Sequence, residues 1–242
     1  MYCLKKVILI ILLLLFITGC GRSENEIILA TEAGFAPYEY YENGEIVGID
    51  IDIAKEVAKE LGKELIVKDI AFDSIINEIK TGKSDFAAAG ISYTEERAKA
   101  VAFSNNYADS KQVVLVRSDS MINSGDDLKN AKIAVQLGSV ADTYVTSKYK
   151  KAEIIRQKKY LATIQDLEDG KADCVVMDEL PAKEILKTKS NMRILDKALV
   201  VDSYGIIVKH SNKELLDVIN KVIKRMQDDG SLEASILRHT TK

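Results

Sequence analysis

Histidine and cysteine are scarce in this sequence of 242 residues, and their scarcity argues against several kinds of active site. The two histidines, His210 and His239, both lie near the C-terminus, so a catalytic triad or metal site built on histidine is not expected. Of the three cysteines, Cys174 lies in the apolar stretch ADCVVM, which is typical of a small buried residue. Because three cysteines are too few for a disulfide framework, the fold is expected to depend on a hydrophobic core.

The sequence also has no net positive charge and contains little proline. A formal net charge of −3 at pH 7 gives no broad basic surface, so nucleic acid is not expected as a partner. With two prolines, 47% apolar residues and 29% charged residues, the composition is that of a globular protein. No stretch resembles a flexible linker, and the length allows one large domain or two small ones.

The N-terminal segment has the organisation of an export signal. MYCLKK is basic, and the apolar run VILIILLLLFI after it has the length of a signal-peptide core rather than of a membrane span. The run leads into FITGC, which resembles the lipobox of bacterial lipoproteins and implies cleavage before Cys20 and lipidation of its thiol. An ordinary secretory signal is the alternative. We expect residues 1–19 to be a signal peptide, residues 20–25 a tether, and the protein to be extracytoplasmic and lipid-anchored to the cell membrane.

From residue 27 onward, predicted strands and helices alternate, which is typical of parallel α/β structure. The pattern falls into two series. The first predicts strands at EIILAT, ELIVKD and SDFAAAG with helices between them, and the second ends in the long helix KELLDVINKVIKRMQDDG. In each series a strand leads through glycine and a hydroxyl residue into a helix, as in AAGISYT and VQLGSVA. Such turns lie at the carboxyl edge of a sheet, where ligands bind, so two domains of this kind would face each other across a cleft.

Arg97 occupies an unusual position for a cation. Thr94 offers an N-cap hydroxyl to a predicted helix, and Glu95 and Glu96 suit the positive end of its dipole. Arg97 falls about three residues into that helix, where unpaired N–H groups and the dipole oppose a positive charge. This placement suggests that Arg97 binds an anion. The alternative is an exposed surface arginine.

Four blocks, in this order, resemble the solute-binding proteins of polar amino-acid ABC transporters: ATEAGFAPYEYYENGEIVGIDIDIAKEVAKELG, GKSDFAAAGISYTEERAKAVAFSNNY, IAVQLGS and GKADCVVMDE. The resemblance runs from about Ile27 to the C-terminal helix. It implies an α/β fold of the type II periplasmic-binding-protein kind, with two lobes, each a sheet flanked by helices, joined by a two-strand hinge. We expect residues 26–109 and 205–242 to form lobe 1 and residues 110–204 to form lobe 2.

The resemblance also implies how a ligand is held. Arg97 would bind the α-carboxylate of an amino acid, and Asp178 would pair with its α-ammonium. An N-cap of the following helix is the alternative for Asp178. Glu32 and Gln136 would meet the far end of the ligand, unless Glu32 points to solvent. The expected ligand-binding residues are Glu32, Phe35, Phe72, Gly90, Ile91, Ser92, Arg97, Gln136, Gly138, Ser139, Val140 and Asp178.

The function implied is capture of a free polar or basic L-amino acid by hinge closure, followed by delivery to the permease subunits of an ABC transporter. Arginine, lysine, histidine, glutamine and cystine remain open as ligands. We expect a monomer without cofactor, metal or catalytic residues. The alternative is an exported enzyme on the same fold, similar to a dehydratase of small carboxylates, in which Glu32 or Asp178 would act as general acid or base.

Overall fold

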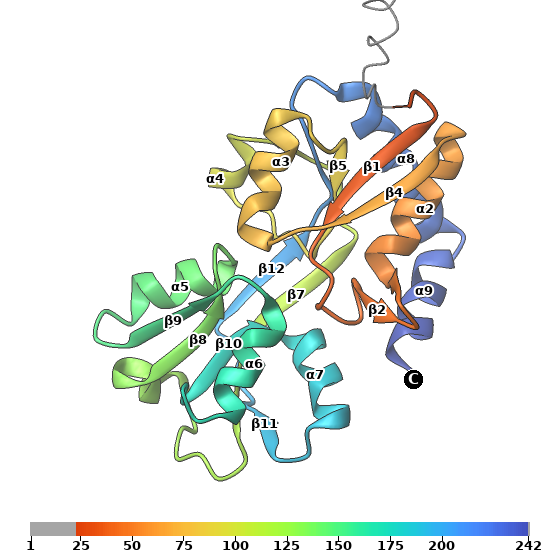
Figure 1. Ribbon diagram of the computed structural model, residues 1–242. Helices are drawn as coiled ribbons and strands as arrows, with labels where there is room; N and C mark the ends of the chain where they lie inside the picture. The colour runs from red at the N-terminus through yellow and green to blue at the C-terminus, as the bar shows by residue number, and fades with distance from the viewer. Residues whose placement is uncertain (1–22, 242) are drawn as a thin grey trace, which may run out of the picture.

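Two α/β lobes joined by a pair of long strands make up the computed structural model (Figure 1), which describes residues 23–241. The expected signal peptide and Cys20, the expected site of lipidation, lie outside the described residues. The sheet of the first lobe has the order β4–β1–β5–β13–β6. Its strands are β4 (Glu64–Asp69), β1 (Glu26–Thr31), β5 (Phe86–Ala87), β13 (Ile207–Val208) and β6 (Ala102–Phe103).

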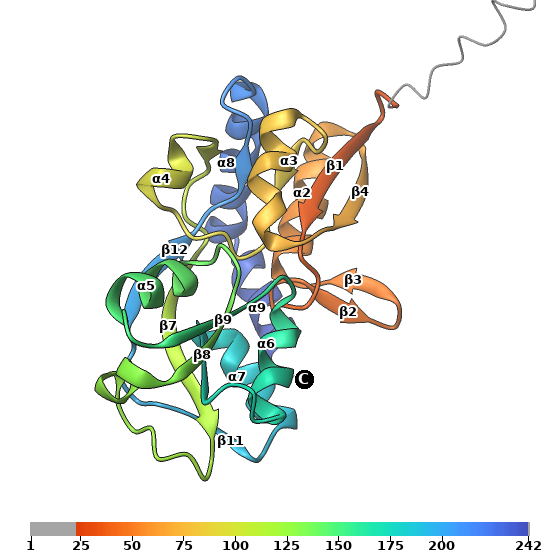
Figure 2. The same cartoon turned by 60° about the vertical axis from the view of Figure 1, so that its left-hand side comes forward.

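Helices flank the sheet of the first lobe because each has one apolar face. In α2 (Ile49–Leu61), Ile53 and Val57 are fully buried, and Gly62 ends the helix in a left-handed conformation. The predicted apolar stripe of α8 (Lys213–Asp228) is buried as well. The other elements are the hairpin of β2 (Tyr40–Glu42) and β3 (Glu45–Val47), the 3₁₀ turn η1 (Phe72–Ser74), α3 (Ile75–Thr81), α4 (Glu95–Ala98) and α9 (Ser231–Thr240). In Figure 2 the hairpin projects from the side of this lobe.

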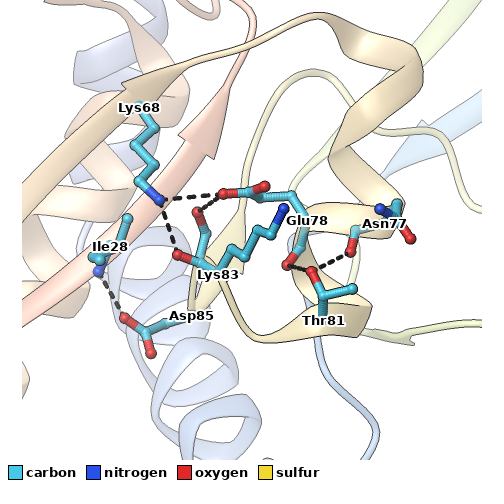
Figure 3. A network of polar contacts seen from close by, with 8 residues as sticks. Ile28, Lys68, Asn77, Glu78, Thr81, Lys83 and Asp85 are labelled. Carbon is cyan, nitrogen blue, oxygen red and sulfur yellow. Dashed lines mark hydrogen bonds and ion pairs between the residues drawn. The ribbon is translucent and has the colours of Figure 1, made fainter. Parts of the chain in front are cut away.

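Polar contacts fix the turn between α3 and β5 (Figure 3). Lys68 Nζ lies 3.2 Å from Glu78 Oε1 and 3.0 Å from the carbonyl oxygen of Lys83. The carboxylate of Asp85 accepts a hydrogen bond of 2.7 Å from the backbone N–H of Ile28. These contacts tie the segment before β5 to β4 and β1.

The predicted strand SDFAAAG is longer than the observed one. Only β5 pairs as a strand, because the chain turns away at Gly90, whose φ of 53° lies in the left-handed region. This early turn brings residues 90–97 to the edge of the sheet.

The second lobe is built on the sheet order β11–β7–β10–β8–β9, with β12 paired to β7. Its elements are β7 (Ala108–Arg117), η2 (Gly125–Asn130), β8 (Lys132–Gln136), α5 (Val140–Lys148), β9 (Glu153–Gln157), α6 (Tyr160–Glu168), β10 (Cys174–Asp178), α7 (Glu179–Thr188), β11 (Met192–Ile194) and β12 (Val200–Tyr204). Cys174 is buried in β10, which confirms its expected role, and burial raises the pKa of its thiol to about 12.

Two antiparallel strands connect the lobes. β7 and β12 pair from Ala108 opposite Tyr204 to Gln112 opposite Val200, and they cross between the two sheets (Figure 1). This is the predicted two-strand connection. Within residues 23–241, no helix is both long enough and apolar enough to span a membrane.

Candidate functional site

A narrow cavity lies between the lobes, next to the crossing strands. The volume of this cavity is about 20 Å³. Its lining residues come from both lobes: Glu32, Phe35, Glu39, Phe72, Ala89, Gly90, Ser92, Arg97, Gln112, Gln136, Ser139, Val140 and Asp178. Ten of the twelve residues expected from the sequence are among them. The other two, Ile91 and Gly138, line an adjoining groove of about 650 Å³, which Arg97 and Phe72 also border.

Arg97 reaches across the cleft. Thr94 caps the short helix α4 as expected, accepting a hydrogen bond of 3.1 Å from the Arg97 backbone N–H. The guanidinium donates to the carbonyl of Ser92 at 2.7 Å in its own lobe and to the carbonyl of Gly138 at 2.9 Å in the other. It also lies over the ring of Phe72, 5.5 Å from the centroid. Arg97 is therefore not a free surface residue, but its partners here are neutral.

Burial makes the charge of Arg97 costly. Burial lowers the pKa of the Arg97 guanidinium, and the nearby carboxyls of Asp202 and Asp178 act in the opposite direction. Two carbonyl oxygens use only part of the five N–H donors of a guanidinium. The remaining donors are suited to a carboxylate, which would supply the missing negative charge.

The Gly90 turn holds the wall of the cavity in place. The Gly90 N–H donates to Asp50 Oδ2 at 2.9 Å, and Asp50 is fully buried in the first turn of α2. A Cβ atom on Gly90 would lie 2.5 Å from Cε1 of Phe35, so a larger residue cannot fit without displacing that ring. Phe35 itself packs edge-on against Tyr160 of the second lobe, with ring centroids 4.7 Å apart.

The turn after β8 supplies the facing wall. Gly138 has a φ of 78°, and its N–H donates to Asp142 Oδ2 at 3.1 Å. Ser139 caps α5, because its hydroxyl oxygen accepts a hydrogen bond of 3.1 Å from the Asp142 N–H. Ser139 and Val140, which is the first residue of the helix, both line the cavity, so the N-terminus of α5 lies at its wall.

Asp178 lies at the end of β10 and is held by the crossing strands. Its Oδ1 accepts hydrogen bonds from Ser110 Oγ at 2.6 Å, from Gln112 Nε2 at 2.8 Å and from the hydroxyl of Tyr204. Asp178 occupies the N-cap position of α7, as the alternative had it, but its side chain makes no capping hydrogen bond. Its Oδ1 instead binds the hydroxyls of Ser110 and Tyr204 and the side-chain amide of Gln112.

The carboxyls around the cavity are held in unfavourable surroundings. Burial, with the nearby Asp202, raises the pKa of Asp178 to about 6. Burial also raises the pKa of Glu32, Asp202 and Glu39, and for Glu39 the neighbouring Asp50 adds to the effect. A cluster of carboxyls with raised pKa values is stabilised by a bound cation.

Glu32 points into the protein, so the alternative of a solvent-facing side chain is wrong. Glu32 as a whole is 1% exposed to solvent. Its Oε2 accepts a hydrogen bond of 3.0 Å from Gln136 Nε2 in the other lobe. Its Oε1 lies 3.3 Å from Nζ of Lys159, with which it forms an ion pair. One oxygen of this buried carboxylate therefore depends on a lysine whose side chain is about half exposed.

Several residues of the site were not expected from the sequence. Glu39, Gln112 and Lys159 are examples, because each arrives through the packing of elements far apart in the chain. Ser110 and Gln112 lie on β7 where it pairs with β12, and the expected two-strand hinge was the one signal that could have suggested them. Among residues 23–241, no group of acidic, histidine or cysteine side chains is arranged to hold a metal ion.

Comparison with known proteins identifies the family of this chain. The sequence model of bacterial extracellular solute-binding proteins, family 3, matches residues 27–241. The chain belongs to this family. It is 30% identical to ABC transporter arginine-binding protein 1 of Escherichia coli over 236 residues, covering 95% of this chain and 96% of the relative.

Solved structures of binding proteins are also similar to this solute-binding protein in fold and sequence. A mutant of ArgBP from T. maritima is 36% identical with a TM-score of 0.87, covering 90% of this chain and 96% of the other. An ancestral arginine-binding protein bound to glutamine is 34% identical with a TM-score of 0.85, covering 91% and 100%. These relatives are named as binding proteins and not as enzymes.

Proposed function

We propose that this solute-binding protein captures a polar or basic L-amino acid between its lobes and delivers it to the permease of an ABC transporter. The observation that carries the proposal is the charge arrangement of one cavity, in which Arg97 faces a surplus of buried carboxyls that includes Asp178 and Glu32. An amino acid with a basic side chain brings one carboxylate and two cations, which matches this arrangement.

Each end of such a ligand has a partner. The α-carboxylate would bind the free N–H donors of Arg97 and the N–H groups at the start of α5 beside Ser139. The α-ammonium would bind Asp178. The distal group would donate to the carboxylate of Glu32, beside Lys159, and contact Gln136, while Phe35 and Phe72 pack against the aliphatic part.

The ligand also explains why the lobes close. Across the cleft, Arg97 donates to a single carbonyl, that of Gly138. A ligand that contacts both lobes adds partners that exist only in the closed arrangement, so binding shifts the protein toward closure. We further propose that the protein works as a monomer, without a cofactor, and that a lipid on Cys20 keeps it near the permease.

The proposal is tested by binding measurements on the purified protein and its Arg97→Ala variant. Thermal unfolding is followed with each proteinogenic amino acid, ornithine and cystine. A ligand at about a thousand times its dissociation constant is expected to raise the melting temperature by about 8–16 °C. Arg97→Ala should weaken the affinity by roughly 100-fold or more, because Asp178 and Glu32 alone cannot hold the carboxylate.

Lys99→Ala is the matched control, since Lys99 is an exposed cation at the end of the same short helix. It should bind like the wild-type protein. Absence of any shift with every amino acid would refute the proposal. Turnover of a bound compound would favour the alternative of an enzyme.

A further inference from the structure

Lys159 of the second lobe makes two ion pairs across the cleft. Its Nζ lies 2.6 Å from Asp69 Oδ1 and 3.3 Å from Glu32 Oε1, and both carboxylates belong to the first lobe. Asp69 is fixed in its own lobe, because it also accepts hydrogen bonds from the Ala33 N–H at 3.0 Å and from the Tyr41 hydroxyl at 3.2 Å. Lys159 is therefore held in a defined place beside Glu32.

The position of Lys159 is not explained by helix stability. It occupies the N-cap of α6, where its side chain makes no capping hydrogen bond and where the helix dipole disfavours a cation. Its side chain is 46% exposed, whereas that of Glu32 is 2% exposed. Glu32 lines the cavity, with its Oε2 bound to Gln136 and its Oε1 paired with the lysine.

We propose that Lys159 is a specificity-determining residue, a resident cation that shares Glu32 with the distal group of the ligand. The inference rests on the proposed function. Two carboxylates, Glu32 and Asp69, and one ammonium leave a single negative charge at this end of the cleft. A cationic side chain neutralises that charge, while a neutral polar side chain only donates hydrogen bonds to Glu32. Lys159 therefore moderates the preference for cationic ligands and keeps neutral ones admissible.

Lys159 acts on closure as well, since its two ion pairs join the lobes. Loss of these pairs weakens closure to the same extent for every ligand, whatever the charge of its side chain. The ratio of two affinities cancels this contribution. A pair of ligands that differ in side-chain charge but not in shape therefore isolates the electrostatic role of Lys159.

L-arginine and L-citrulline form such a pair, because a neutral ureido group replaces the guanidinium. Their dissociation constants are measured by titration calorimetry at neutral pH for the wild-type protein, Lys159→Met and Lys158→Met. We expect the preference for arginine over citrulline to rise roughly tenfold in Lys159→Met, since Glu32 and Asp69 then lack their counter-ion. Lys158 is the exposed neighbour and makes no ion pair with the described residues, so Lys158→Met should keep the wild-type ratio.

A ratio that stays unchanged or falls in Lys159→Met would overturn the inference. Lys159→Arg keeps the positive charge and should keep the wild-type ratio, which guards against an effect of altered folding. If neither arginine nor citrulline binds the wild-type protein but another amino acid does, the inference is wrong and the proposed capture stands. If no amino acid binds, both fail.

Discussion

At the scale of single residues, the site is dominated by carboxyls that their surroundings push toward the protonated form. Asp178 is the clearest case, because burial and Asp202 raise its pKa to about 6 even though Ser110 and Gln112 donate hydrogen bonds to it. A carboxyl so placed is ionised at neutral pH only at a free-energy cost. An α-ammonium beside it would remove that cost, which links binding of the ligand to loss of a proton.

Ligand affinity should therefore fall in mildly acidic solution. Asp178 must be ionised to bind an α-ammonium, so the dissociation constant is expected to rise about tenfold for each pH unit below pH 6 and to level off above it. Titration calorimetry between pH 5 and 8 measures this slope. Asp178→Asn should bind weakly at every pH and should lose the slope. A wild-type affinity that is flat from pH 5 to 7 would contradict the role of Asp178.

Sequence reasoning reached those residues whose surroundings are local. Arg97 stood out because a cation followed an N-cap and two acids, and Gly90 and Gly138 because glycine preceded a helix. Lys159 and Tyr204 gave no such signal. Their roles exist only because Lys159, at the start of α6, meets Asp69 at the end of β4, and because β12 pairs with β7.

At the scale of elements, helices were easier to predict than strands. The apolar stripes of α2 and α8 have a clear period, and both helices are observed. The hairpin of β2 and β3 was not predicted, although its turn carries Asn43 and Gly44, which have φ values of 52° and 86°. An Asn-Gly pair is the usual signal for such a turn. The strand at β5 was overestimated because alanine and glycine do not mark where a ladder ends.

The start of α5 offers a test of how one element supports the site. Ser139 accepts a hydrogen bond from the Asp142 N–H, so Ser139→Ala should destabilise the protein by about 1 kcal/mol and lower the melting temperature by about 2–4 °C. Ser139→Thr retains a capping hydroxyl and should be close to the wild-type protein. Thermal unfolding of the three proteins without ligand measures the effect. Equal melting temperatures for all three would show that the cap contributes little.

At the scale of the whole molecule, the two lobes and the cleft between them could be predicted from the alternation of strands and helices and from the paired turns. The contacts that hold the lobes together could not, because they depend on side chains that meet only in three dimensions. Arg97 with Gly138 and Lys159 with Asp69 join the lobes directly, while Asp178 is held by both crossing strands. Closure thus brings acidic groups together in a space with little water.

Stability without ligand should consequently depend on pH in an unusual direction. The pKa of Asp50 is raised from 3.8 to about 6 by burial, and that of Asp178 changes in the same direction. Because the folded state binds these protons more tightly than the unfolded state, their stabilisation is complete below about pH 4 and is lost as pH rises through 6. For the fully buried Asp50, this difference is on the order of 3 kcal/mol.

We therefore expect the free energy of unfolding, measured with urea, to be greater at pH 5 than at pH 7 in the protein freed of ligand. Asp178→Asn should show a smaller difference, since one of the titrating groups is gone. A saturating amino acid should stabilise the protein more at pH 7 than at pH 5, because its α-ammonium offsets the ionised Asp178. Greater stability at pH 7 without ligand would mean that exposed carboxylates such as Asp127 and Asp169, whose pKa values are lowered by hydrogen bonds, outweigh the buried cluster.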